Sequence, residues 1–251
     1  MALPKLNHPT IDVKIPSTKE KATFRPYTVK EQKILLMLKE SSSPEEIVQV
    51  LKNLISSTCV GKINPEKLAY FDIEYLFLKI RAFSVGEKTQ VNYKCNNVVE
   101  DSTCGSVTPI DIDISDIEVD FSGVVPQEIQ VGKDIVIKFR YPSIESANWI
   151  LDYRTNNNFD SLIKAIVSDV TLVKDSDSIY DDFTQEELTE FVNSLPLEAF
   201  DKVLQYYISC PTVKKKVNFK CKKCGYSEDI ILRSEEHTSE LQSLAYLVCR
   251  L

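Results

Sequence analysis

The stretch VNFKCKKCGYSEDIIL (residues 217–232) carries two cysteines, Cys221 and Cys224, between two runs of strand-like residues. Gly225 follows the second cysteine, and glycine adopts the left-handed backbone of a tight turn without steric cost. A cysteine pair with this spacing can hold a metal ion, carry out redox chemistry or remain a pair of ordinary thiols. Redox pairs lie at the start of a helix, whereas Gly225 and SEDIIL predict a turn and then a strand. The stretch therefore predicts a β-hairpin whose turn presents two thiols, here called a cysteine knuckle.

An earlier stretch has the same plan. VNYKC is followed by NNVVEDST and then by CGSVTPIDI, so that Cys95 ends a predicted strand and a glycine follows Cys104. Four thiolates from the two knuckles would complete a tetrahedral zinc site, and its predicted ligands are Cys95, Cys104, Cys221 and Cys224. Such a site leaves no coordination position for water, so the zinc would be structural and folding would depend on it.

The interval between the first two cysteines raises alternatives to zinc. Its eight residues, NNVVEDST, exceed the roughly two to four residues of common zinc knuckles. Either the first knuckle contains an inserted loop between its two cysteines, or it has lost its metal. Idle thiols and redox-active thiols therefore remain alternatives at this stage.

Short similar sequences that recur in the same order along the chain indicate an internal duplication. Phe24-Arg25-Pro26-Tyr27 and Phe139-Arg140-Tyr141-Pro142 each precede a predicted helix, and Phe71-Asp72 and Phe200-Asp201 each open a helix that leads into a cysteine-bearing strand. The order of hairpin, helix, capped helix, core helix and strand is the same both times. We predict an α+β fold with a first repeat at residues 1–108 and a second at 109–232. In each, a β-hairpin and helices accompany a strand-borne cysteine knuckle, and the two knuckles form a zinc-ribbon-like element.

Capping signals place the predicted helices. Thr28 and Glu31 have the spacing of a capping box, and Ser43 and Glu46 have the same spacing around Pro44, which suits a first helical position. Thr184 and Glu187 repeat the signal in the second half. The segment KLAYFDIEYLFLKIRAF is apolar enough on all sides to predict a helix at the centre of a core. Its aromatic residues could instead form a docking face.

Composition limits the classes of function. Hydrophobic residues make up 43% of the 251 residues and charged residues 27%, which is typical of a folded protein. No apolar run approaches the roughly 20 residues that cross a bilayer, and the N-terminal residues lack a secretory h-region. We expect reduced thiols in a cytosolic setting or in an assembly built there. No phosphate-binding loop, nucleophile elbow or HExxH motif occurs, so the sequence predicts no enzyme.

Charged clusters have simple interpretations. The acidic run from Asp111 to Asp120 alternates with isoleucines and predicts the solvated side of a strand rather than a calcium loop. A basic cluster consists of Lys214, Lys215, Lys216, Lys220, Lys222 and Lys223. Lysines beside aromatic residues on a zinc knuckle can bind single-stranded nucleic acid, so a zinc-ribbon regulatory module is an alternative function. The net charge of −7 disfavours it. Cys59 and Cys210 are expected to be packing residues.

The last residues differ in character from the rest. RSEEHTSELQS (residues 233–243) resembles a common sequencing adapter translated in one frame, and we hypothesise that residues 233–251 are an artefact. Cys249 and His237 are therefore left out of site predictions, which leaves His8 as the one remaining histidine.

Two longer segments carry a family resemblance. The opening residues up to Leu38, with MxLPKL and FRPYTVKEQKxLL, and Tyr70–Glu87, with FDIEYLFLxIRxxSVGE, resemble the baseplate hub subunit and hub assembly proteins of T-even-type contractile-tailed bacteriophages. The resemblance covers about residues 1–230 and is strongest in the first 90. It implies a non-enzymatic role in building the hub, through contacts with other hub and tail proteins. It also implies a location in the virion baseplate or, during assembly, in the host cytoplasm. From hydropathy we expect no membrane partner, and the net charge disfavours a nucleic-acid partner.

Overall fold

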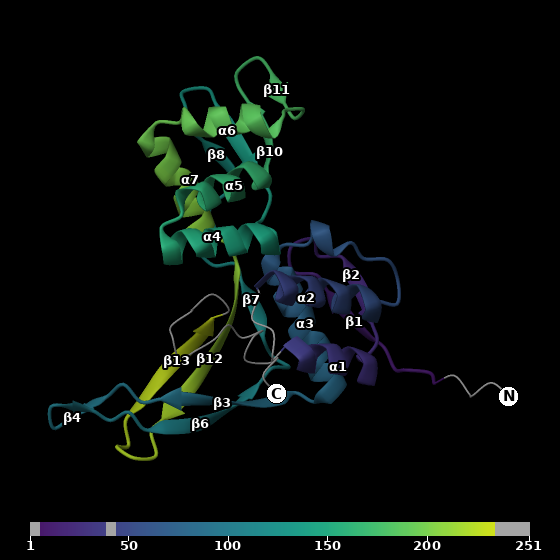
Figure 1. Cartoon of the computed structure of the whole chain (residues 1–251), viewed down its shortest axis with the longest axis vertical. Helices are drawn as coiled ribbons and strands as arrows, with labels where there is room; N and C mark the ends of the chain where they lie inside the picture. The colour runs from purple at the N-terminus through teal and green to yellow at the C-terminus, as the bar shows by residue number, and fades with distance from the viewer. Residues whose placement is uncertain (1–5, 39–43, 234–251) are drawn as a thin grey trace. The chain divides into compact units, whose positions relative to one another are not determined.

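The computed structural model describes residues 6–38 and 44–233 (Figure 1). Its α-helices are α1 (Val29–Leu38), α2 (Pro44–Thr58), α3 (Tyr70–Val85), α4 (Ile144–Asn156), α5 (Phe159–Asp169), α6 (Gln185–Asn193) and α7 (Leu197–Ser209), with a 3-10 turn at Pro65–Lys67. Its strands are β1 (Ile11–Lys14), β2 (Lys21–Phe24), β3 (Lys88–Lys94), β4 (Val98–Val99), β5 (Ser102–Thr103), β6 (Val107–Asp113), β7 (Glu118–Asp120), β8 (Glu128–Gln130), β9 (Val136–Phe139), β10 (Val170–Lys174), β11 (Ile179–Tyr180), β12 (Thr212–Lys220) and β13 (Ser227–Arg233). This mixture confirms the α+β class.

The described chain divides into two compact units. Unit 1 combines the residues up to Pro65 with Phe71–Asp120 and with the chain from Thr212 onward, and unit 2 consists of Glu66–Tyr70 and Phe121–Pro211. Unit 1 is therefore built from segments of both predicted repeats. The boundary predicted after residue 108 falls inside β6, so the repeat boundaries and the duplication itself stay predictions.

Unit 1 begins with an antiparallel hairpin of β1 and β2, in which Ile11 lies opposite Phe24. The hairpin turn is fixed to α3, because the backbone N–H and the hydroxyl of Ser17 donate to the two carboxylate oxygens of Asp72, at 2.9 and 2.5 Å. The capping signal at Thr28 is confirmed, since α1 starts at Val29 and the Glu31 carboxylate accepts from the Thr28 N–H at 2.7 Å.

Helix α3 lies at the centre of the unit 1 core, as its apolar sequence predicts. Phe71, Ile73, Leu76, Leu78 and Ile80 have no exposed surface. The side chains point around the whole helix, which explains why the segment lacks an amphipathic pattern. Of the aromatic residues that could have formed a docking face, Tyr70, Phe71 and Phe77 are buried and serve packing, whereas Tyr75 is half-buried.

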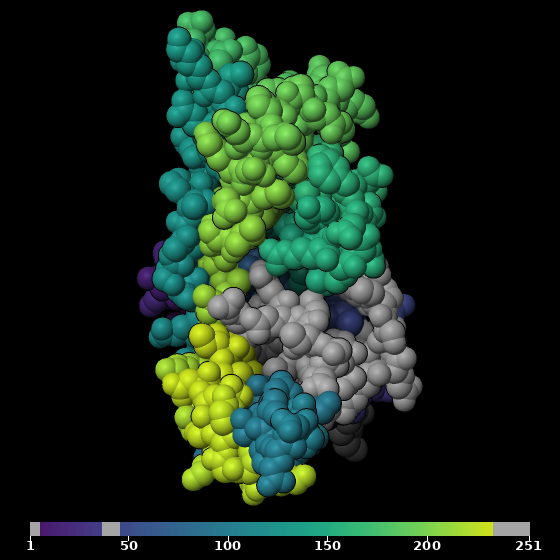
Figure 2. Space-filling model, turned by 90° about the vertical axis from the view of Figure 1, so that its left-hand side faces the viewer, coloured from purple at the N-terminus to yellow at the C-terminus, as the bar shows by residue number. Residues whose placement is uncertain are grey.

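Two further hairpins complete unit 1. Strands β3 and β6 pair along their whole length, and β12 pairs with β13 on one side and with β7 on the other, all antiparallel. Burial alternates along β6, with Ile110 and Ile112 inside and Asp111 exposed, so the prediction of a solvated strand side is confirmed there. The rest of the acidic run differs, because Asp116 lies in a turn and Glu118 and Asp120 lie on β7. Seen from the side, the blue-teal atoms of the β3–β6 hairpin lie against the yellow atoms of the β12–β13 hairpin (Figure 2).

Unit 2 is a four-stranded antiparallel sheet in the order β11-β10-β9-β8, with α4, α5, α6 and α7 gathered on one face (Figure 1). The rings of Phe139, Tyr206 and Tyr207 form its aromatic centre, with centroid separations between 5.2 and 6.1 Å. The predicted capping box of Thr184 and Glu187 is present at the start of α6.

Some predictions fall outside the described residues or differ in detail. Ser43 and residues 234–251, including nearly all of the adapter-like segment, are not among the residues that the structure describes. The polar segment DSDSIYDD (residues 175–182) contains the short strand β11, which pairs with β10. No helix among the described residues has both the length and the apolar character of a membrane span.

Candidate metal centre

The second cysteine knuckle is built by backbone hydrogen bonds at the end of the β12–β13 hairpin. The N–H of Cys221 donates to the carbonyl of Tyr226 at 2.8 Å, and the N–H of Gly225 donates to the carbonyl of Cys221 at 3.1 Å. Gly225 has a φ of 76°, in the left-handed region where a side chain would be strained. The predicted turn and strand are confirmed, and a helix start, as redox pairs require, is absent from this described segment.

The first knuckle closes in the same way. The N–H of Cys95 donates to the carbonyl of Ser106 at 2.9 Å, and the N–H of Gly105 donates to the carbonyl of Cys95 at 3.0 Å. Gly105 has a φ of 61°. Both knuckles therefore share one backbone design, although their cysteines are spaced differently in the sequence.

The eight-residue interval folds into a small hairpin of its own. Strands β4 and β5 pair there, and the two residues between them, Glu100 and Asp101, have φ values of 50° and 63°. Two successive residues with positive φ are typical of the tight turns that join hairpin strands. The N–H of Cys104 donates to the carbonyl of Asn97 at 2.8 Å at the base of this hairpin. The interval is therefore an inserted hairpin that leaves the backbone of the first knuckle closed.

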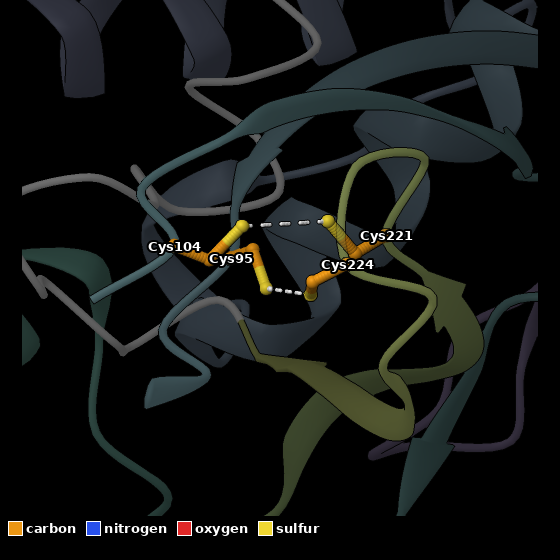
Figure 3. Close-up of side chains that lie close together, drawn as sticks. All are labelled: Cys95, Cys104, Cys221 and Cys224. Carbon is orange, nitrogen blue, oxygen red and sulfur yellow. Dashed lines mark hydrogen bonds between the residues drawn. The ribbon is translucent and has the colours of Figure 1, made fainter. Parts of the chain in front are cut away.

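The four predicted ligand residues come together in one cluster (Figure 3). The sulfurs of Cys95 and Cys224 are 3.6 Å apart, those of Cys104 and Cys221 are 3.9 Å apart, and all four lie within 4.8 Å of one another. A tetrahedral ion with zinc–sulfur bonds of about 2.3 Å requires sulfurs about 3.8 Å apart. A disulfide requires about 2.05 Å, so these are free thiols at metal-binding separation. The cluster could therefore bind a metal ion.

The electrostatics of the cluster favour mixed protonation of its thiols. Backbone N–H groups of Cys224 and Lys223 lower the pKa of Cys221 to about 6 despite its burial. Burial raises the pKa of the Cys95 thiol to about 12, and its contacts with the neighbouring sulfurs add to this effect. A bound cation would replace the remaining protons, because only thiolates ligate metals.

Aromatic and charged side chains flank the centre. The rings of Tyr93 on β3 and Phe219 on β12 pack edge to face with centroids 4.6 Å apart, and Phe219 is fully buried. The hydroxyl of Tyr93 donates to the Glu228 carboxylate on β13 at 3.2 Å. Burial and the charge of Glu228 both raise the pKa of Tyr93. These contacts join the two knuckle-bearing hairpins beside the sulfur cluster.

Half of the predicted basic cluster is paired with carboxylates of unit 1. Lys214 contacts Asp120 at 2.8 Å, Lys216 contacts Asp229 at 2.7 Å, and Lys215 contacts Asp116. Surface pairs of this kind contribute little stability, but they reduce the positive charge that a phosphate backbone would meet.

Other predicted residues lie apart from this centre. Among the described residues the only group suited to hold a metal is the four-cysteine cluster, and neither Cys59 nor Cys210 belongs to it. Cys210 is buried and Cys59 is half-buried next to Phe24 through an isolated β-bridge, in keeping with packing roles.

The fold and site define an α+β protein in which paired cysteine knuckles from distant parts of the chain meet at a closed four-thiol centre. A family model described as T4 bacteriophage base plate protein matches residues 8–237. The chain belongs to this family, which indicates a structural or assembly role in a phage baseplate. Comparison with curated proteins and with solved structures gives no match.

Proposed function

We propose that the protein is a component or an assembly factor of the baseplate hub, and that it works without catalysis through contacts with other hub and tail proteins. The observation that carries this proposal is the family match, which spans nearly the whole chain. The assignment to the hub in particular rests on the resemblance of residues 1–38 and 70–87 to hub proteins. The expected locations are the tail baseplate of the virion or, during assembly, the host cytoplasm.

We further propose that Cys95, Cys104, Cys221 and Cys224 bind one structural zinc ion. The sulfur separations, the shared knuckle design and the absence of a disulfide among these residues support this assignment. Four protein thiolates fill a tetrahedral site, so no position is left at which a water molecule could be activated. A closed site suits a structural protein and gives no support to a metal-dependent enzyme.

The metal would act as a clamp. It would join the β3–β6 hairpin to the β12–β13 hairpin, whose cysteines Cys104 and Cys221 are 117 residues apart in the sequence. Beside the sulfur cluster, the two hairpins are also joined by the ring contact of Tyr93 with Phe219 and by the hydrogen bond from Tyr93 to Glu228. A rigid pair of hairpins would offer a fixed surface to a partner, including the exposed side chains of Val98 and Val107.

The paired lysines support protein contacts over the alternative of nucleic-acid binding. Three of the six lysines lie against Asp116, Asp120 or Asp229, and the chain as a whole is acidic. A nucleic-acid-binding module should instead show binding that falls steeply with salt concentration.

The proposal is tested in the phage that encodes the protein. Inactivation of the gene should yield tail intermediates that lack a complete central hub, and plasmid-borne wild-type protein should restore the hub. The Cys224→Ser variant should fail to restore it at the infection temperature, whereas Cys59→Ser, which changes a cysteine outside the cluster, should succeed. Complete hubs in the absence of the protein would refute the role. Mass spectrometry of purified virions then separates a retained component from an assembly factor.

A further inference from the structure

The β1–β2 hairpin of the first predicted repeat and the β8–β9 hairpin of the second are both antiparallel, and their backbone pairing continues to the turn in the same way. In the first, the N–H of Ile15 donates to the carbonyl of Glu20, and in the second the N–H of Val131 donates to the carbonyl of Ile135. Four residues lie between the bonded pair in the first turn and three in the second, as the sequence shows. The second turn, Gly132-Lys133-Asp134, is therefore one residue shorter than the first, and it contains no serine.

The helix facing each hairpin carries an aspartate after a phenylalanine. In unit 1, Asp72 on α3 accepts two hydrogen bonds from Ser17, whose neighbours Ile15 and Pro16 are buried. In unit 2, the corresponding Asp201 on α7 is exposed. Within the described chain, no serine reaches this carboxylate from the shorter turn.

An open surface pocket of about 380 Å³, here called the cavity, lies between β8 and α7, and Asp201 is one of the residues that line it. Val125, Pro126 and Ile129 supply apolar surface, and Asp201, Lys202 and Gln205 supply polar groups from α7. The ammonium of Lys202 donates to the carbonyl of Gln130 at 3.2 Å and so ties the helix to the edge strand beside the cavity.

We propose that this cavity binds a segment of another protein in which a proline or another apolar residue precedes a serine or threonine. The N–H and hydroxyl of that residue would donate to Asp201, and the apolar neighbour would cover Val125, Pro126 and Ile129. The first hairpin makes this arrangement within the chain through Pro16, Ser17 and Asp72. The anionic carboxylate complements the paired donors, and charge-assisted hydrogen bonds of this kind are stronger than neutral ones. The inference does not depend on the metal centre.

The test uses the full chain labelled with nitrogen-15 and the acetylated, amidated peptide KIPSTKE, which copies residues 14–20. Titration should produce saturable amide shifts at Glu128, Gln130 and Lys202. A peptide with Ser17→Ala and Thr18→Ala should bind about tenfold more weakly or worse, as expected for loss of hydrogen bonds to a charged group.

Variants of the protein complete the test. Asp201→Ala should weaken binding of KIPSTKE by a similar factor, and because Asp201 is exposed the fold should be retained. Glu198→Ala changes another exposed carboxylate of α7 that does not line the cavity, and it should leave binding unchanged. Absence of saturable shifts at millimolar peptide, or equal binding of both peptides, would overturn the proposal without affecting the metal assignment.

Discussion

Arg25 and Arg140 occupy equivalent backbone positions at the ends of two different hairpins. The N–H of Arg25 donates to the carbonyl of Thr58, and the N–H of Arg140 donates to the carbonyl of Asp169, at 2.9 Å in both cases. The preceding residues also correspond, since Phe24 bridges to Cys59 and Phe139 pairs with Val170. These matched contacts support the predicted duplication.

The acidic partner of the arginine differs between the two positions. Arg25 pairs with Glu31 from the first turn of α1 at 2.8 Å, whereas Arg140 lies 3.5 Å from Asp169 at the end of α5. Ser146, three residues after the cap of α4, stands where Glu31 stands in α1 and donates to Asp169 at 2.8 Å. The two arginines therefore have acidic partners from different places, Glu31 from the helix that follows Arg25 and Asp169 from the end of α5.

The metal assignment predicts about one zinc ion per chain in protein purified without chelators. Replacement of Cys95, Cys104, Cys221 or Cys224 by serine, one at a time, should each reduce the zinc content and lower the thermal midpoint, because a tetrahedral structural site needs all four ligands. Elemental mass spectrometry and calorimetry measure both quantities. Cys59→Ser is the matched control and should keep the metal. Protein with no zinc, or with zinc lost only on changes to Cys221 and Cys224, would contradict the four-ligand site.

Removal of the inserted hairpin tests the independence of the first knuckle. Deletion of Val98–Thr103 leaves the sequence CNNCG, which has the spacing of CKKCG in the second knuckle. We expect the zinc content to be unchanged, since the hydrogen bonds from Cys95 to Ser106 and from Gly105 to Cys95 do not involve β4 or β5. If the deletion abolishes metal binding while the protein remains folded by circular dichroism, the inserted hairpin is part of the site rather than an addition to it.

Acidification should destabilise unit 1 through Glu31. Burial alone would raise the pKa of this carboxyl, but hydrogen bonds from Arg25 and Thr28 lower the pKa to about 2. Because the folded pKa lies below the unfolded value, the stabilisation is complete above about pH 4.5 and is lost as the pH falls toward 2. With allowance for solvent screening we expect roughly 1–2 kcal/mol. Glu31→Gln should show a smaller loss of unfolding free energy over this pH range than the wild type.

In unit 2, Asp169 should make the free energy of unfolding fall as the pH rises, which is opposite to the effect of Glu31. Burial raises the pKa of this carboxyl to about 6, although Ser146, Arg140 and Tyr207 each act to lower it. The folded state therefore holds a proton that the unfolded state has lost, and stability falls as the pH rises from about 4 to 6. The expected decrease is about 2–3 kcal/mol. Urea unfolding of Asp169→Asn should lack this decrease, and an unchanged pH profile would show that another group is responsible.

Local signals in the sequence predicted much of the fold. The spacing of Thr28 and Glu31 located the start of α1, and the glycines after Cys104 and Cys224 located both knuckle turns. Each of these features depends on residues a few positions apart, which is the range over which caps and turns are determined. The all-round apolar character of α3 likewise predicted its central position.

Features that depend on distant pairing could not be read in this way. Strand β7 joins β12 across 94 residues at the Lys214–Asp120 contact, and no periodicity in either segment indicates that partner. The hairpin between Cys95 and Cys104 was expected only as an inserted loop, because strands of two residues are too short to show alternation. The assembly of unit 1 from distant segments could not be predicted for the same reason, since local sequence signals do not show which distant segments pair.

The composite make-up of unit 1 also sets an order of events during translation. Its two thiols at Cys95 and Cys104 emerge from the ribosome long before Cys221 and Cys224, and nearly all of unit 2 is synthesised in between. Unit 2 can pack as soon as Pro211 is available, whereas unit 1 stays incomplete until the β12–β13 hairpin appears. Nascent chains stalled before Thr212 should therefore contain a folded unit 2 and an incomplete unit 1, in which the thiols of Cys95 and Cys104 lack Cys221 and Cys224 as neighbours and are exposed to oxidants.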